Sequence, residues 1–534
     1  MRRTNLLLLL GIVGCTGGNP PPVAVAADPP PPKIKNIILM IGDGMGPQQV
    51  GLLDLYAQRA QDPQVSNPTA MRRFMQEGYI GFSRHDPAEG LVVDSACSAS
   101  QIATGVPSLS ESIGLDAKGM AAETVLERAQ KQGRSTGLVS DTRLTHATPA
   151  SFAAHVPHRS MENEIAEQLI AAKVDVMLSG GIRHFLPNTI NGDAARNEAM
   201  FAELKETIAP LKSKRKDDRN LLMEAREAGY TVVTDRELLR DAQGERLLGL
   251  FSYSGMLDGI AYHAAGEERK EPSLAEMTEK AIDWLAKDED GFFLMVEGGQ
   301  IDWAAHGNDA GTMLHEMVKF DEAIEAVYNW AKDRDDTLVI ITADHETGGF
   351  GMSYSRYDVP DSRVIPGGMF DEGSPYAPNF NFGVPEQLDK MYAQKEAFYR
   401  IFMAFGQLED GQKTPATLME MVNEISAFDI TLAQAERILA SEPNAHQVEG
   451  HKYLSAETFP KFNDFEAFYV YGEDSRTGLL ARELGEQQNI VWGTGTHTHT
   501  PVTVIAWGPE AMTQPMSRMM HHTEIGQALF EALR

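Results

Sequence analysis

The chain has few cysteines, fewer basic than acidic side chains, and no apolar run long enough to cross a membrane. Only two cysteines, Cys15 and Cys97, occur among its 534 residues. If Cys15 is lipidated or removed, no intramolecular disulfide can form, which excludes a disulfide-stabilised scaffold. The 47 lysines and arginines against 76 aspartates and glutamates give a formal net charge of −29. Because no basic stripe is available to neutralise phosphates, we exclude nucleic acid as a partner.

The first 33 residues have the pattern of a targeting segment and a tether. Arg2 and Arg3 precede an apolar run over residues 6–14, which is shorter than the roughly 20 residues that a spanning helix needs. Residues 12–15, Ile-Val-Gly-Cys, resemble a lipobox. We therefore expect a lipoprotein signal peptide at 1–14, a lipid anchor to the membrane at Cys15, and a periplasmic location. The alternative is an ordinary secretory signal that is cleaved near residues 23–27. The prolines within 15–33 indicate an extended tether.

From residue 34 onward, short β-rich runs alternate with helical patterns. Strands are predicted at 34–41, 135–139, 174–178, 292–296, 337–342 and 501–507, and helices at 116–132, 274–287, 309–332 and 522–533. This alternation is typical of an α/β fold with a mostly parallel central sheet and helices on both faces. Over about 352–473 the pattern changes to a segment rich in Pro, Gly, Tyr and Asp, followed by predicted helices at 388–407 and 415–440. We expect one large domain, 34–534, with an inserted crown or loop region at about 352–473.

One serine lies where a nucleophile would be expected. Val92 and Val93 predict the end of a buried strand, and Asp94, Ser95 and a run of small residues follow. A serine at a helix start points toward free backbone N–H groups that suit an anion. Its hydroxyl is a poor nucleophile unless a base or a metal lowers its pKa. The alternative is that Asp94 and Ser95 only cap a helix.

Acidic and histidine side chains follow several of the predicted strands. They are Asp43, His146, Glu297, Asp302, His306, Asp344, His345 and a histidine at 497 or 499. A helical turn would present Asp302 and His306, four residues apart, to one metal ion. Mixed Asp and His sets suit zinc, whereas Asp, Glu and Thr oxygens suit magnesium. Each residue alone could be a cap or a turn residue, but together they predict a metal site.

These motifs, in this order, resemble those of the alkaline phosphatase family. The matching stretches span residues 35 to 510 and are Asp43-Gly44-Met45-Gly46, Asp94-Ser95-Ala96 with Ser98-Ala99, residues 145–150, Glu297-Gly298-Gly299 with Asp302 and His306, residues 342–346, and the terminal histidine cluster. The resemblance implies a metal-dependent phosphomonoester hydrolase that releases inorganic phosphate from many monoesters. It also implies two zinc ions, one magnesium ion and a homodimer.

The resemblance also implies a role for each matching residue. Ser95 is the implied nucleophile, which becomes phosphoserine, and Arg159 is the implied phosphate clamp. The implied ligands are Asp43, Asp344 and His345 for one zinc, Asp302, His306 and His497 for the other, and Asp43, His146, Thr148 and Glu297 for magnesium. Counting back from residues 506–509 favours His497 over His499. The zinc near Ser95 would stabilise its alkoxide, and the other zinc the oxygen of the leaving alcohol.

Two features depart from the family pattern. Trp303 occupies a position where other relatives carry lysine or histidine, and in this the chain resembles certain marine bacterial members. We expect Trp303 to face the substrate. The stretch between His345 and His497 is longer than in the compact bacterial enzymes. It would form a dimer-clasping loop, a crown over the active site, or a peripheral surface insertion.

The sequence has two classes of alternative interpretation: a related enzyme of the same superfamily and a non-catalytic binding protein. A sulfatase needs a Cys/Ser-x-Pro-x-Arg motif, and residues 95–99 lack both the proline and the arginine. A phosphodiesterase or a metal-dependent phosphomutase is a closer rival, although a diesterase would not need the third metal site that His146, Thr148 and Glu297 imply. A non-catalytic lipoprotein that binds metal or phosphate would be favoured by loss of Ser95 or of a ligand, and none is missing.

Overall fold

A ten-stranded sheet forms the centre of the protein, for which a computed structural model describes residues 34–192, 204, 208–364 and 375–534. Its order is β16-β2-β15-β8-β1-β7-β3-β4-β6-β5. The strands are β1 Asn36–Gly42, β2 Tyr79–Arg84, β3 Ser135–Arg143, β4 Val176–Gly180, β5 Tyr230–Val233, β6 Arg246–Leu250, β7 Phe292–Gly298, β8 Thr337–Thr342, β15 Val502–Trp507 and β16 Met519–His521. Only β15 runs antiparallel to its neighbours β8 and β2, so the predicted mostly parallel sheet is confirmed.

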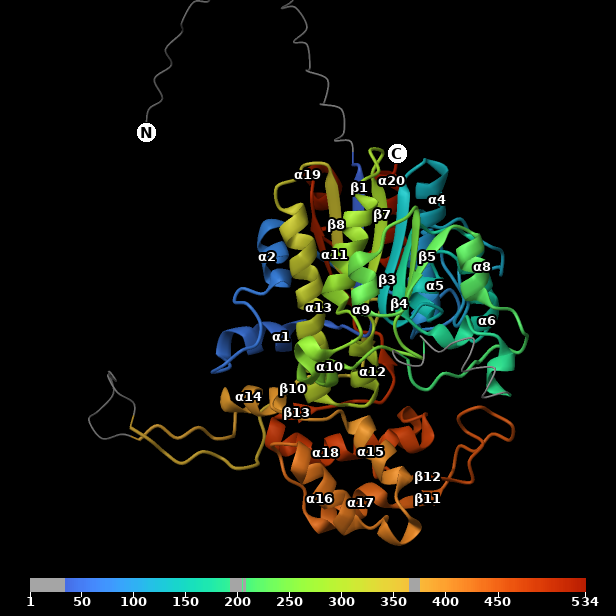
Figure 1. Cartoon of the computed structure of the whole chain (residues 1–534). Coiled ribbons are helices and arrows are strands. Elements are labelled where there is room, and N and C mark those ends of the chain that lie inside the picture. Colours follow the sequence, from blue (N-terminus) through green and yellow to red (C-terminus); the bar gives the residue numbers. More distant parts are fainter. Residues whose placement is uncertain (1–33, 193–203, 205–207, 365–374) are drawn as a thin grey trace, which may run out of the picture. The chain divides into compact units, whose positions relative to one another are not determined.

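Helices cover both faces of this sheet (Figure 1). The described helices outside the insertion are α1 Pro47–Arg59, α2 Ala70–Glu77, α3 Ser95–Thr104, α4 Val125–Lys131, α5 Ala147–Ala150, α6 Glu162–Ala171, α8 Leu221–Glu227, α9 Arg236–Asp241, α10 Gly259–Ala265, α11 Leu274–Leu285, α12 Gln300–His306, α13 Ala310–Ala331, α19 Glu510–Thr513 and α20 His522–Ala532. Alternate side chains of the fully buried β1 enter different cores, because successive residues of a strand point to opposite faces. Ile38 and Met40 pack with α1, α2, α11 and α13, whereas Ile37 and Leu39 pack with α3, α4, α6 and α20.

The insertion has its own small helices. They are α14 Glu386–Tyr392, α15 Phe398–Gln407, α16 Pro415–Ile425 and α17 Leu432–Leu439, followed by α18 Arg476–Gln488. Three two-stranded pairs accompany them: β9 Glu346–Thr347 with β14 His497–Thr498, β10 Gly351–Met352 with β13 Ile490–Val491, and β11 Ser441–Pro443 with β12 Thr458–Pro460. Figure 1 shows the orange helices α15 to α18 gathered together near α12.

Both long helices predicted in the insertion are interrupted. After α14, the carboxylate of Asp309 accepts hydrogen bonds from the side chain of Gln394 and from the backbone N–H of Phe398, which holds the chain in a turn. After α16, the side chain of Asn423 both donates to and accepts from the backbone of Ile430. Such side-chain hydrogen bonds compete with the helical backbone pattern.

Two predictions in the first third of the chain are wrong. The segment before Asp94 is not a strand: Val92 is 49% exposed, and the backbone carbonyl of Val93 accepts from the His497 side chain instead of from a strand. The helix predicted at 116–132 is only Val125–Lys131, because the Asp116 carboxylate accepts from the backbone N–H of Lys118 and Met120 in a turn.

The parallel strands β1, β3, β7 and β8 bring their carboxyl ends to one edge of the sheet, where α/β folds bind ligands. The described residues all belong to one compact unit, Lys33–Arg534. The predicted signal peptide at 1–14 and nearly all of the tether at 15–33 belong to a second unit, Met1–Pro32, which is not among the described residues. None of the helices in the described part of the chain has the length and apolar character needed to span a membrane.

Candidate functional site

Three buried side chains surround Ser95 at the carboxyl ends of β1 and β8. Asp43 follows β1, and Asp344 and His345 follow β8. The Nε2 atom of His345 lies 3.4 Å from Asp43 Oδ1 and 3.3 Å from Asp344 Oδ2. The same Nε2 atom is 3.2 Å from Ser95 Oγ. We call Asp43, Asp344 and His345 the first group; it places the serine hydroxyl beside a possible metal position.

Ser95 is the first residue of α3, and Asp94 is the cap of that helix. The Asp94 carboxylate accepts from the backbone N–H groups of Ala96 and Cys97. It also accepts from Nη1 of Arg159 at 3.0 Å. The alternative that these residues only cap a helix therefore holds for Asp94 alone, because the hydroxyl of Ser95 faces His345.

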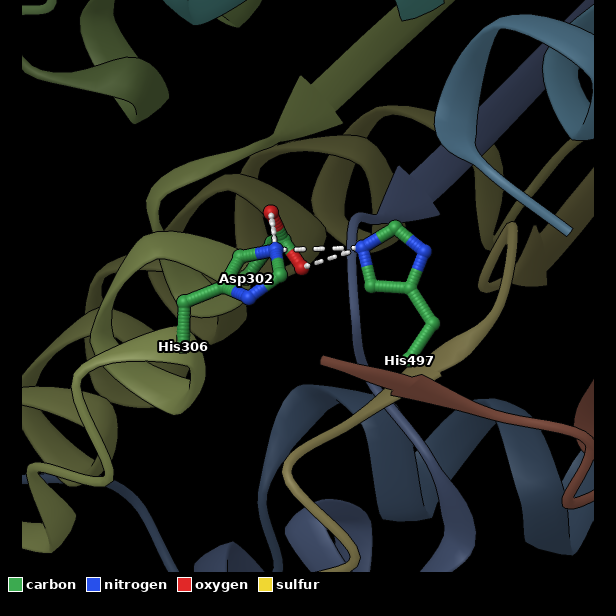
Figure 2. Close-up of side chains that lie close together, drawn as sticks. All are labelled: Asp302, His306 and His497. Atoms are coloured by element: carbon green, nitrogen blue, oxygen red, sulfur yellow. Dashed lines mark hydrogen bonds and ion pairs between the residues drawn. The ribbon is translucent and has the colours of Figure 1, made fainter. Parts of the chain in front are cut away.

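A second group is formed by Asp302, His306 and His497 (Figure 2). The helix α12 presents Asp302 and His306 on one face, and the Nε2 atom of His306 lies 3.3 Å from Asp302 Oδ2. His497 comes from β14, and its Nε2 atom lies 3.6 Å from Asp302 Oδ1 and 3.1 Å from His306 Nε2. The rings of His345 and His497 stack with centroids 3.6 Å apart, which joins the first and second groups.

Backbone carbonyls fix the tautomers of both histidines in the second group. Nδ1 of His306 donates to the carbonyl of Gly495 at 2.7 Å, and Nδ1 of His497 donates to that of Val93 at 2.8 Å. A carbonyl oxygen only accepts, so each neutral ring carries its proton on Nδ1 and a lone pair on Nε2. Metal-ligating histidines are held in the same way.

A third group contains Asp43, His146 and Glu297. Glu297 is the penultimate residue of β7, and its Oε2 accepts from the hydroxyls of Ser140 and Thr142. Its other oxygen, Oε1, lies 3.9 Å from Nδ1 of His146. Thr148, in the short helix α5, is also fully buried. Asp43 therefore belongs to both the first and the third group.

The buried polar atoms of these groups fit divalent cations. Among the described residues, no hydrogen-bond partner is found for Asp43 Oδ1 and Oδ2, Asp344 Oδ2, His146 Nδ1, Thr148 Oγ1 and Glu297 Oε1. Unpartnered buried carboxylates are strongly unfavourable unless a cation compensates them. Burial, then repulsion from Asp302, raises the pKa of Asp344 to about 8, and burial with repulsion from Asp344 raises that of Asp43 well above its usual value.

The remaining predicted site residues lie around these groups. Arg159 donates through Nη1 to Asp94 and through Nη2 to Nε2 of His146 at 3.2 Å. Trp303 meets the His146 ring edge-on, with centroids 5.9 Å apart, and its contact with substrate stays a prediction. His499 lies outside the second group, and its ring is 5.3 Å from that of His85.

Two further side chains at the site were missed from the sequence. Thr347 Oγ1 donates to Asp302 Oδ1 at 2.5 Å. Tyr471, which comes from the end of the insertion, meets the His306 ring edge-on with centroids 5.1 Å apart. Burial, then the charge of Asp302, raises the pKa of Tyr471 to about 12, so its phenol stays neutral at ordinary pH. An aromatic run at residues 465–471 was the only sequence signal for Tyr471.

Comparison with known proteins identifies the family of this chain. A family model described as alkaline phosphatase matches residues 34–365. Alkaline phosphatase 3 of Bacillus subtilis is 32% identical over 508 residues, covering 94% of this chain and 89% of that protein. The alkaline phosphatase of Thermus thermophilus has the same fold, with a TM-score of 0.73, 24% identity, and coverage of 94% of this chain and 92% of that chain.

A third similarity is to a mutant alkaline phosphatase from the Antarctic bacterium TAB5, whose structure has Mg bound in its M3 site. It has a TM-score of 0.57 and 22% identity, and covers 94% of this chain and 99% of that chain. The matching family model and the Bacillus relative decide the classification. This chain belongs to the alkaline phosphatase family and is a phosphomonoesterase, and its structure contains three candidate metal-binding groups.

Proposed function

We propose that the enzyme hydrolyses phosphate monoesters through a phosphoserine intermediate at Ser95. The observation that carries this proposal is the 3.2 Å contact between Ser95 Oγ and Nε2 of His345, beside buried carboxylate oxygens that have no hydrogen-bond partner. Such a cluster binds cations, and a cation beside a serine oxygen lowers the pKa of the hydroxyl.

We assign two zinc ions and one magnesium ion to the three groups. The N and O atoms of the first and second groups suit zinc, and the oxygens of Asp43, Glu297 and Thr148 suit magnesium. When bound, these cations would supply Lewis-acid stabilisation of the oxyanions and neutralise the charge of the phosphoryl group. His146 joins the third group through Nδ1, on the opposite side of its ring from the Arg159 guanidinium.

In this reaction, Ser95 is the nucleophile and Arg159 binds the phosphate group. Ser95 Oγ forms a bond to phosphorus as the ester P–O bond breaks, the serine proton passes to solvent, and the alcohol leaves with a proton. Water then attacks phosphorus and breaks the Ser95 Oγ–P bond, which releases inorganic phosphate and restores the hydroxyl. Arg159 binds two phosphate oxygens through its planar fork, and its contact with Asp94 keeps the fork oriented.

We also propose that the protein is exported to the periplasm, lipid-anchored at Cys15 and homodimeric, with 1–14 as signal peptide and 15–33 as tether. The lipobox-like residues 12–15 support the anchor. Exposed apolar side chains at the start of the insertion support a second copy as partner: Tyr354, Phe380, Phe382 and Val384. Labelling with radioactive palmitate, absent in Cys15→Ala, tests the anchor, and sedimentation equilibrium tests the dimer.

The proposed reaction is tested with p-nitrophenyl phosphate and bis-p-nitrophenyl phosphate. We expect rapid turnover of the monoester, loss of activity on chelation, and recovery when zinc and magnesium are restored together. A preference for the diester would assign the protein to the diesterase branch of the superfamily. Metal binding without turnover of either ester would leave a binding protein.

A further inference from the structure

A cavity of about 940 Å³ lies between α12 and the helical part of the insertion. Its lining includes Trp303 and His306 on one side and Tyr471 on the other. Within the described part of the chain, this lining includes His306 of the second group but no side chain of the first or third group. The cavity therefore adjoins the active site from the side of the second group. Its size lies in the range of small-molecule sites, about 300–1,000 Å³.

The insertion supplies an apolar wall to this cavity. The helix α15 contributes Phe398, Phe402, Met403 and Phe405, and α17 contributes Leu439. Met403 is 58% exposed although it belongs to this wall. An exposed apolar surface next to a polar active site is typical of a surface that binds an apolar part of a ligand.

The charged side chains of the lining are Asp258, Asp309, Glu316, Lys413, Glu473, Asp474 and Arg476. Arg476 pairs with Glu473, and Lys413 pairs with Asp410. The first three also have partners within the protein. Asp258 accepts from Nε of Arg400 at 2.6 Å and from the Tyr399 hydroxyl at 3.0 Å. Glu316 pairs with Lys319 at 2.5 Å, and Asp309 accepts from Gln394 and Phe398. These groups are satisfied within the protein, so they offer little to a charged ligand.

The geometry of displacement directs the leaving alcohol toward this cavity. Ser95 Oγ contacts His345 of the first group. In phosphoryl transfer, the attacking and leaving oxygens lie roughly in line on opposite sides of phosphorus. The leaving oxygen therefore faces away from Ser95, toward the second group, whose His497 ring stacks on His345 and whose His306 lies at the cavity.

We propose that this cavity binds the apolar organic part of the substrate, so that the enzyme prefers monoesters of alkyl or aryl alcohols to monoesters of small polar alcohols. The proposal rests on the proposed function, because it takes the second group as the side from which the alcohol leaves. Met403 and Phe402 determine this preference, and Tyr471 borders the entrance beside His306.

The test compares ethyl phosphate with hexyl phosphate, whose leaving alcohols have similar acidity. Each buried methylene contributes about 0.8 kcal/mol, and we expect partial burial to raise kcat/KM for hexyl phosphate about tenfold or more over ethyl phosphate. Met403→Glu places a charge on the apolar wall and should remove most of this preference, because it lowers kcat/KM for hexyl phosphate far more than kcat/KM for ethyl phosphate. Phe402→Leu, which keeps an apolar side chain, should reduce the preference only in part.

Met120→Glu is the matched control, because Met120 is 64% exposed and is not part of the cavity lining. Calorimetric titration with ethylphosphonate and hexylphosphonate gives a second readout that does not depend on turnover. Equal rates for the two esters, or an unchanged preference in Met403→Glu, would overturn the proposal. Failure of every variant and the wild type to hydrolyse ethyl phosphate would instead contradict the proposed function.

Discussion

The Nε2 atoms of His306 and His497 lie 3.1 Å apart, although each ring donates its Nδ1 proton to a backbone carbonyl. When both rings are neutral, these tautomers direct two lone pairs at each other. Although burial opposes it, the charge of Asp302 raises the pKa of His306 above its usual value, whereas burial lowers the pKa of His497 to about 4. The carboxylate of Asp302 lies close to the same pair of Nε2 atoms. A cation at this point would take the two Nε2 lone pairs and the Asp302 carboxylate as ligands.

This arrangement predicts that His497, and not His499, is needed for metal binding. Loss of a partner outside the ligand set already weakens metal affinity by about 10–100-fold, so His497→Ala should lower the affinity of the second group by at least that much. His499→Ala is the matched control and should retain the full metal content. Metal analysis of the two purified variants after dialysis measures this, and equal metal loss in both would contradict the assignment.

Metal binding should release protons near neutral pH. The pKa of Asp344 is raised to about 8 without a cation, so this carboxyl is largely protonated below that pH and must ionise to become a ligand. The affinity for zinc should therefore increase as the pH rises toward 8. Zinc titration of the metal-free protein in buffers of different ionisation enthalpy counts the protons released. A heat of binding that is the same in every buffer would contradict this coupling.

Arg159 should contribute to the binding of the product phosphate. Its guanidinium is held by Asp94 at 3.0 Å, which leaves the fork oriented for phosphate oxygens. Arg159→Ala should weaken inhibition by inorganic phosphate by about 2 kcal/mol, or about 30-fold. Arg159→Lys keeps the charge without the fork and should recover only part of the loss. The assigned role fails if the inhibition constant is unchanged in Arg159→Ala.

Glu271 should make the free energy of unfolding depend on pH. Burial raises its pKa from the usual 4.5 to about 7, although it accepts from the backbone N–H of Leu257. The folded state then binds more protons at Glu271 than the unfolded state between these values. The contribution of Glu271 to stability is therefore greatest below about pH 4.5 and is lost as the pH rises from there through about 7. Glu271→Gln keeps a hydrogen-bond acceptor and removes the charge.

We expect Glu271→Gln to be more stable than the wild type by about 3 kcal/mol at about pH 8 and to differ little at about pH 4.5. Urea midpoints at the two pH values measure the difference. A variant whose midpoint follows the pH in the same way as the wild type would show that Glu271 is not the titrating group.

The local parts of the site could be predicted from the sequence, and the contacts made through the insertion could not. A spacing of four residues was enough to place Asp302 and His306 on one face of α12, and the apolar runs were enough to place β1, β7 and β8 in a parallel sheet. The alternation of strands and helices was therefore sufficient to predict the fold class, which the structure confirms.

Nonlocal contacts explain what was missed. Val92 and Val93 have the composition of a strand, but the Val93 carbonyl accepts a hydrogen bond from Nδ1 of His497, about four hundred residues later in the chain. The breaks within the predicted helices of the insertion depend on Asp309 and Asn423, whose partners are set by packing. Tyr471 reaches His306 only because the insertion folds back on α12, and no periodic pattern marks such a contact.

The central claim is that Ser95 carries the phosphoryl group between the alcohol and water. The most direct measurement is mild-acid quenching of the metal-loaded enzyme with a phosphate monoester, followed by mass spectrometry of the peptide that contains Ser95. We expect a phosphoserine at Ser95 in the wild type, and none in Ser95→Ala, which should keep its metal ions because the serine is not among the three groups. Phosphate on another residue, or turnover by Ser95→Ala at the wild-type rate, would contradict the account.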